Sequence, residues 1–189
     1  MAKISWKPGN MVYPVPAALI TCGSKESGNA NIITVAWIGT ICTNPSMLYI
    51  SLRPERHSYD IISEDMQFTV NLTTKHMVRA TDWCGVRSGR DYNKFKETGL
   101  TQINGIANSC CMLEESPVNI ECKVSEILHL GSHDMFIARV VNVVADDRYL
   151  DPETGVFKME DAELIAFCHG KYYSLGEMLG KFGFSVKKS

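Results

Sequence analysis

MFIARVVNVV, residues 135–144, is the stretch that decides the fold class of this chain. It is rich in β-branched residues, whose side chains favour an extended backbone, and it is followed by Asp146-Asp147, a pair typical of turns. Residues 118–125 alternate apolar and polar side chains with a period of two. This is the period of a half-buried strand. The two stretches therefore predict two β-strands.

Four earlier stretches carry the same strand signals. They are Ala17–Thr21, Ile32–Ile38, Met47–Arg53 and Phe68–Leu72. Six strands in one chain predict a sheet that closes toward a barrel. The expected fold class is therefore mainly β, a small barrel with short helices at its periphery.

The helical signals are short. Ser58 can cap a helix over Tyr59–Glu64. Thr74 can cap a second helix, whose Met77 and Val78 would point inward.

Two further helical segments are predicted toward the C-terminus. One covers Tyr92–Thr98, because Gly99 is the usual residue just after a helix. The other is the tail Leu175–Phe182, whose apolar residues have helical spacing. We expect this tail to dock on the barrel or on a partner subunit.

Length and composition are those of one globular domain. The chain has 189 residues, of which 45% are hydrophobic and 21% are charged. A compact domain of this length buries roughly 70% of its unfolded surface, and no linker or repeat divides residues 1–189. The formal net charge is -2 and no basic stripe interleaves with aromatic residues, so nucleic-acid binding is not expected.

The sequence predicts neither a membrane segment nor a metal site. Polar residues interrupt every apolar run well before the roughly 20 residues that cross a bilayer, and Met1–Pro8 lacks the apolar core of a secretory signal. We therefore expect a cytoplasmic protein. The seven cysteines include no C-x-x-C pair, so we expect most of them to be reduced, buried side chains with a structural role.

The turn after the third predicted strand gathers groups that bind phosphate. Arg53, Arg56, His57 and Ser58 lie close together, next to the predicted start of a helix. Arginine forks, a hydroxyl and free helix amides offer a phosphate dianion both hydrogen bonds and positive charge. The alternative is a solvated basic turn in which Glu55 pairs with one arginine.

Trp37 and His133 are the other candidate ligand contacts. Gly39 and Thr40 follow Trp37 closely, which leaves backbone exposed beside a large aromatic ring and would suit a flat ligand. The alternative is that Trp37 is a core residue. His133 follows a glycine turn and could approach a ligand from the barrel rim, or it could be a polar turn residue only.

Several catalytic motifs are missing from the sequence. It has no G-x-x-x-x-G-K loop, no G-x-G-x-x-G before a helix and no H-E-x-x-H. Serine hydrolase, kinase and zinc protease activities therefore have no support.

Taken in order, these clusters resemble the flavin reductase-like family of FMN-binding split barrels, and most closely its flavoredoxin branch. The matching residues span nearly the whole chain: Asn31–Trp37 with Gly39-Thr40, Thr43-Asn44-Pro45, Ser51–Pro54 with Arg56-His57-Ser58, Phe68–Asn71, Gly131–Asp134 and Tyr172–Gly176.

The resemblance implies a homodimer of six-stranded Greek-key split barrels, with one FMN per subunit near the dimer interface. Arg53, Arg56 and Ser58 would hold the phosphate. The ribityl chain and the isoalloxazine ring would be lined by four residues, Asn31, Thr34, Trp37 and Thr40.

The resemblance also implies roles at the edges of the site. Lys94 would lie near the flavin or its phosphate, where a cation would stabilise the anionic reduced flavin. His133 would lie where a nicotinamide or a redox partner docks, and Phe167 with Tyr172 would form a lid. Flavin reductases of the family commonly read Gly-Asp-His where this chain reads Gly131-Ser132-His133. The missing carboxylate bears on the use of NADH or NADPH more than on FMN binding.

Three functions remain open. The first is an oxidoreductase or electron carrier of the flavoredoxin type, which holds FMN and passes electrons to a partner protein. The second is an NAD(P)H-dependent flavin reductase that supplies reduced FMN, and the third is a ligand-binding barrel with no redox role. We predict the first, because the phosphate cluster occurs with a flavoredoxin-like order of motifs. The intact set Arg53, Arg56 and Ser58 argues against the third. The lack of a paired acid and base agrees with flavin chemistry, in which transfer at N5 needs no general base.

Overall fold

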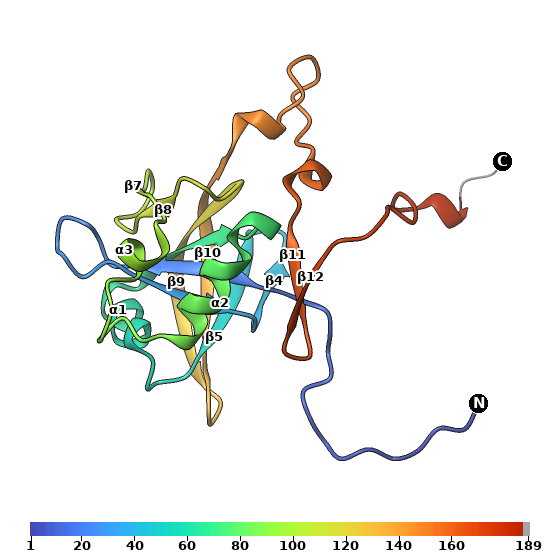
Figure 1. Cartoon of the computed structure of the whole chain (residues 1–189), viewed down its shortest axis with the longest axis horizontal. Helices are drawn as coiled ribbons and strands as arrows, with labels where there is room; N and C mark the ends of the chain where they lie inside the picture. Colours follow the sequence, from blue (N-terminus) through green and yellow to red (C-terminus); the bar gives the residue numbers. More distant parts are fainter. Residues whose placement is uncertain (187–189) are drawn as a thin grey trace.

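The computed structural model describes residues 1–186, and its main feature is a curled sheet of seven strands, all paired antiparallel (Figure 1). In spatial order the strands are β3 (Asn31–Val35), β2 (Ala18–Cys22), β6 (Gln67–Leu72), β9 (Val118–His129), β10 (Asp134–Ala145), β5 (Met47–Leu52) and β4 (Ile38–Cys42). Six of them are the strands expected from the sequence, so the prediction of a mainly β fold is confirmed. The seventh strand is β4, which was not expected and overlaps the predicted strand Ile32–Ile38 only at Ile38.

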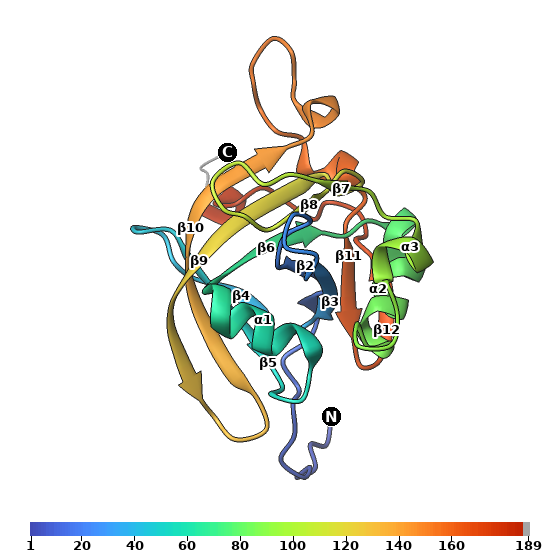
Figure 2. The ribbon, with the colours of Figure 1, turned by 90° about the vertical axis from the view of Figure 1, so that its left-hand side faces the viewer.

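The predicted strand Ile32–Ile38 breaks after Val35, and this break gives the sheet its shape. Strand β3 is one edge of the sheet and β4 is the other, and only Ala36-Trp37 joins them. The carbonyl of Trp37 accepts a hydrogen bond of 2.8 Å from the amide of Ser51 on β5. Because two residues connect opposite edges, the sheet must curl into a split barrel (Figure 2).

Side chains of β3 point alternately to two cores, as the period of a strand requires. Ile33 and Val35 face the barrel interior, where they pack in one cluster with Ile61 and Ile62 of α1 (His57–Asp65). The opposite face of the strand, with Ile32, packs against α2 and α3. These helices cover Val78–Val86 and Lys94–Thr98, and contribute Cys84 and Phe95 to the second cluster. The outer edge of β3 therefore runs between α1 on one side and α2 and α3 on the other.

The short helices lie where the sequence places them, but their first turns differ from expectation. Helix α1 begins at His57 with Arg56 as its N-cap, so the prediction that Ser58 caps this helix is wrong. Ser58 is buried inside the first turn instead. Thr74 precedes a 3-10 turn, η1 (Lys75–Met77), that runs into α2. Helix α3 starts later than predicted but ends at Gly99, which has a φ of 71°.

Two small sheets and three further 3-10 turns complete the chain. Their bounds are β1 (Val15–Pro16), β11 (Ile165–Cys168) and β12 (Lys171–Ser174) in one sheet, β7 (Gln102–Ile103) and β8 (Met112–Leu113) in the other, and η2 (Asp147–Tyr149), η3 (Met159–Ala162) and η4 (Phe184–Val186). No helix among residues 1–186 is long and apolar enough to cross a membrane.

The C-terminal tail does not behave as predicted. The stretch 175–182 contains no helix and does not dock on its own barrel. It extends away from the barrel, on the same side as the N-terminal segment (Figure 1). Its apolar side chains, Leu175, Met178, Leu179 and Phe182, are all exposed.

Strand β9 holds a fully buried carboxylate. Its alternation is as expected at Lys123 and Ser125, which are exposed, but Asn119 and Glu121 are covered by the segment between α3 and β9. The carboxylate of Glu121 accepts bonds from the amides of Ile106, Ala107 and Asn108 at 2.8 to 3.1 Å, and one of 2.7 Å from the side chain of Asn142.

These bonds decide the charge state of Glu121. Burial by itself would raise the pKa of this carboxyl, but the bonds from Asn142 and from the loop amides outweigh burial and hold the pKa below its usual value. The ionised carboxylate therefore ties the loop to the sheet.

We expect Glu121→Gln to lower the free energy of unfolding by about 2 kcal/mol at pH 7. The glutamine NH2 group would replace one carboxylate oxygen, so N–H donors of the loop would lose their acceptor. A carboxyl whose pKa is lower in the folded protein than in the unfolded chain stabilises the fold at pH values above its unfolded pKa. This stabilisation is lost as the pH falls through the folded pKa. The difference in the free energy of unfolding between the unaltered protein and Glu121→Gln should thus be constant down to about pH 5 and become smaller at lower pH. Urea unfolding across this range measures it. Glu126→Gln, at an exposed position of the same strand, is the control, and an equal loss in both variants would contradict the role of Glu121.

Candidate functional site

The outer edge of β3 lines a continuous groove. It consists of three hollows, which we name A, B and C, with volumes of about 200, 160 and 580 Å³. Hollows A and B share Ile33 and Arg56. Hollows B and C share five residues, Ala36, Trp37, Ser51, Arg53 and His133. Because β3 pairs only with β2, its remaining backbone N–H and C=O groups face this groove, where a ligand can use them.

Two glycines, one in the last turn of α2 and one just after it, let this part of the chain lie directly against β3. A Cβ atom on Gly89 would collide with the side-chain amide of Asn31, and one on Gly85 would lie 3.2 Å from Cβ of Thr34. Thr34 itself donates a hydrogen bond to the carbonyl of Thr81 on α2. The wall of hollow A therefore depends on residues without side chains, which allow two backbones to approach closely.

Hollow A is rich in cations. It is lined by Arg56, Arg87, Arg90 and Lys94, together with His57, whereas Glu55 is its one carboxylate among the described residues. Arg90 is already engaged, since it donates 2.8 Å to the carbonyl of Glu55 and 3.3 Å to the carboxylate of Asp60. Arg56 forms no ion pair within residues 1–186.

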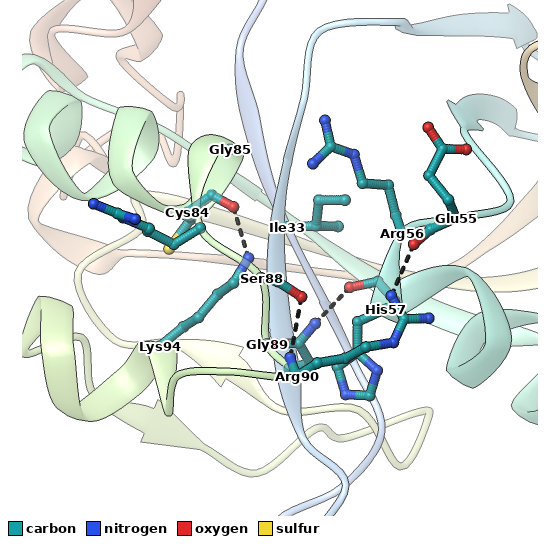
Figure 3. A pocket seen from close by; sticks show the side chains of 13 residues that line it. Ile33, Glu55, Arg56, His57, Cys84, Gly85, Ser88, Gly89, Arg90 and Lys94 are labelled. Atoms are coloured by element: carbon teal, nitrogen blue, oxygen red, sulfur yellow. Dashed lines mark hydrogen bonds between the residues drawn. The ribbon is translucent and has the colours of Figure 1, made fainter.

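Lys94 is the most unusual of these cations, because only 4% of it is exposed. Figure 3 shows it reaching from the start of α3 to the carbonyl of Cys84 on α2, to which Nζ donates at 2.7 Å. In the described part of the chain it has no carboxylate partner. Burial lowers the pKa of Lys94. A buried ammonium without a counter-charge is costly, so the site favours a ligand that brings negative charge.

A hydrogen bond between Asn31 and Ser58 fixes two further polar side chains of hollow A. The side-chain amide of Asn31 on β3 donates 2.8 Å to the hydroxyl of Ser58 on α1, and both residues are buried. This bond joins the strand to the first turn of α1, where the leading amides of a helix lack partners within the helix. Hollow A thus combines helix amides, a hydroxyl and cations, the set of groups that suits a phosphate.

Hollows B and C have a different character. Trp37 lines both, and its ring lies 6.2 Å from that of Tyr13 between centroids. Arg53 also lines both, and pairs with Glu55 at 3.5 Å. Burial, followed by the neighbouring Arg53 and Arg56 charges, lowers the pKa of His133. His133 is therefore neutral at pH 7.

The structure brings most of the predicted site residues together. Eight of them line the groove: Asn31, Thr34, Trp37, Arg53, Arg56, Ser58, Lys94 and His133. Arg53 lies at hollows B and C and not at hollow A, so it shares a hollow with Arg56 but not with Lys94.

Three predicted residues do not line these hollows. Thr40 is exposed on β4. Phe167 packs against Tyr13 at 6.4 Å between ring centroids, and Tyr172 donates 3.2 Å to the carboxylate of Asp82 on α2.

Sequence reasoning missed the opposite wall of hollow A, which is formed by Gly85, Arg87, Ser88, Gly89 and Arg90. A signal was present in the Ser88-Gly89 pair between two arginines, since Ser-Gly pairs mark turns. Only the fold places this turn beside Asn31.

Comparisons with known proteins agree on one family. The structure is similar to the flavoredoxin of Desulfovibrio vulgaris (Miyazaki F), with a TM-score of 0.89, 29% identity, and coverage of 98% of this chain and 100% of that chain. It is also similar to a flavoredoxin from Methanosarcina acetivorans, with a TM-score of 0.87, 25% identity, and coverage of 99% and 100%.

A curated relative has an assigned activity. The NADH-dependent FMN reductase AsuE2 of Streptomyces nodosus subsp. asukaensis is 24% identical over 129 residues, which are 68% of each chain. The sequence profile of the flavin reductase like domain matches residues 10–176. With that match over most of its length, the chain belongs to the flavin reductase-like domain family.

Proposed function

We propose that this chain is an FMN-binding flavoprotein of the flavoredoxin type, which transfers electrons through bound FMN. The observation that carries the proposal is the buried ammonium of Lys94, which has no carboxylate partner among residues 1–186. FMN carries a phosphate dianion, and its ring becomes negative on reduction. Either charge would offset the cost of burying Lys94.

Hollow A is the proposed phosphate site. Arg56 and Lys94 supply charge, the first amides of α1 supply hydrogen-bond donors, and the helix dipole adds to both. Ser58 accepts a bond from Asn31, and its hydroxyl could donate to a phosphate oxygen.

Hollow B is the proposed ring site. The unpaired edge of β3 from Ile33 to Val35 offers backbone groups to the polar edge of the ring, and Trp37 would lie beside the ring. Bound FMN would supply the redox chemistry, while the protein binds, orients and tunes it.

Residues around His133 favour an electron carrier over a nicotinamide-dependent reductase. Ser132 stands where flavin reductases commonly have a carboxylate. The neighbouring Asp134 does not replace it, since its carboxylate accepts 2.6 Å from Tyr59 and lies 2.8 Å from Nδ1 of His129. The second candidate function, an NAD(P)H-dependent reductase that supplies reduced FMN, is supported by the similarity to AsuE2.

We also propose that the chain works as a homodimer in the cytoplasm. Both terminal segments extend away from the barrel (Figure 1) and expose large apolar side chains, including Trp6, Met178 and Phe182. Covering apolar surface of this kind with a partner subunit stabilises the assembly, because the apolar area is removed from water.

We expect Lys94→Met to weaken FMN binding at least tenfold, a loss of about 1.4 kcal/mol, because it removes the buried charge. The melting temperature of the flavin-free protein should stay the same or rise, since an unpaired buried charge is removed. Fluorescence titration with FMN and with riboflavin measures the first effect. A loss confined to FMN would assign Lys94 to the phosphate, and an equal loss for both would assign it to the ring.

Lys96→Met is the matched control, because Lys96 is exposed on the same helix. An unchanged FMN affinity in Lys94→Met would contradict the proposed site.

We expect the purified protein, once supplied with FMN, to show flavin absorbance bands between about 300 and 550 nm. Under anaerobic conditions, bands that persist after addition of NADH or NADPH indicate a carrier reduced by another protein. Bleaching within seconds favours the reductase instead. If no bands appear even after incubation with FMN, the protein is not a flavoprotein.

We expect light scattering to give a molar mass of about 42 kDa, twice the 21.1 kDa of one chain. Replacing Met178 and Phe182 by serine should shift the mass toward that of a monomer at low micromolar concentration, because it removes apolar contact area. A monomeric mass for the unaltered protein would disprove the dimer.

A further inference from the structure

Hollow C is the largest of the three hollows, and the placement of FMN proposed above leaves it unfilled. Its volume of about 580 Å³ falls within the roughly 300–1,000 Å³ of small-molecule sites. It continues hollow B past Trp37, and the N-terminal segment around Met11 contributes to its lining. A ligand here would lie beside the ring proposed for hollow B.

The lining of hollow C contains both apolar and polar side chains. The large apolar ones are Met11, Val12, Val15, Trp37, Leu130 and Met135. The polar ones are Asn10, Tyr49, Ser51, Arg53, Ser132 and His133. No aspartate or glutamate of the described chain lines this hollow, so its one permanent charge is the cation of Arg53.

Arg53 is free to bind a ligand. It does not line hollow A, where Arg56 and Lys94 lie. Its ion pair with Glu55 is a single contact of 3.5 Å between side chains that are both about half exposed, and exposed pairs of this kind contribute little. A guanidinium has five N–H donors in a planar fork that matches a carboxylate.

His133 adds an imidazole to the polar lining of hollow C. Its Nδ1 lies 3.0 Å from the hydroxyl of Ser132, which orients the imidazole. As a neutral ring it can donate a hydrogen bond but adds no charge. The hollow therefore presents one cation, one oriented imidazole and an aromatic wall.

We propose that hollow C binds a small aromatic or conjugated carboxylate, with its carboxylate group on Arg53 and its apolar body against Trp37. This inference rests on the proposed function, since it places the ligand next to the FMN ring. The charged group sets it apart from a nicotinamide, whose ring carries a neutral carboxamide.

The test compares ligands that differ in one feature. FMN-loaded protein is titrated with benzoate, with benzamide and with acetate, by calorimetry and by the visible difference spectrum of the flavin. Benzoate should bind at least tenfold more tightly than benzamide, because only benzoate carries the charge. It should also bind more tightly than acetate, which lacks the apolar body.

Arg53→Gln should remove the preference for benzoate over benzamide, and Arg53→Lys should keep part of it. Arg139→Gln is the matched control, because Arg139 is exposed on β10 and lines none of the three hollows. It should leave the preference unchanged.

Equal affinity for benzoate and benzamide, tighter binding of benzamide, or no benzoate binding to protein that holds FMN would overturn this inference alone. Retention of the full preference in Arg53→Gln would also overturn it. Failure to bind FMN would instead refute the proposed function, and the flavin spectrum reports this independently of benzoate.

Discussion

The whole arrangement depends on how the two edges of the sheet are joined. Strands β3 and β4 lie at opposite edges, yet only Ala36-Trp37 connects them, and the bond from the Ser51 amide to the Trp37 carbonyl holds this connection. The sheet can satisfy both constraints only by curling. Curling leaves the outer edge of β3 unpaired between α1 and the pair α2 and α3, and that unpaired edge is the floor of the groove.

The charges in the groove are separated along its length. Lys94 lies at hollow A, Arg56 at hollows A and B, and Arg53 at hollows B and C with the neutral His133. Cations in different hollows can bind different anionic groups. A ligand whose only negative charge lies at Lys94 would leave Arg53 available for a second anion. A buried charge needs partners, and Glu121 finds them within the chain. Its carboxylate accepts hydrogen bonds from loop amides and needs no ligand.

Much of the fold could be predicted because strand signals are local. Periodicity and β-branched residues located six strands, and Gly99 marked a helix end. The break at Ala36-Trp37 was not predicted, because apolar residues continue through it and only the pairing of Trp37 with Ser51 ends the strand. The C-terminal segment was predicted to be helical from its spacing, but a short helix needs a surface to pack on, and its own barrel offers it none.

The sequence by itself determined six strands and the cationic turn around Arg56, since each depends on neighbouring residues, and it carried the family resemblance through the order of its motifs. Only the tertiary structure decided which charges are buried and which are paired. Lys94 is buried because α3 packs against α2 and β3, and Glu121 is buried because a distant loop covers it. The free energy of a charge depends on burial and on partners far along the chain, and sequence spacing does not contain that information.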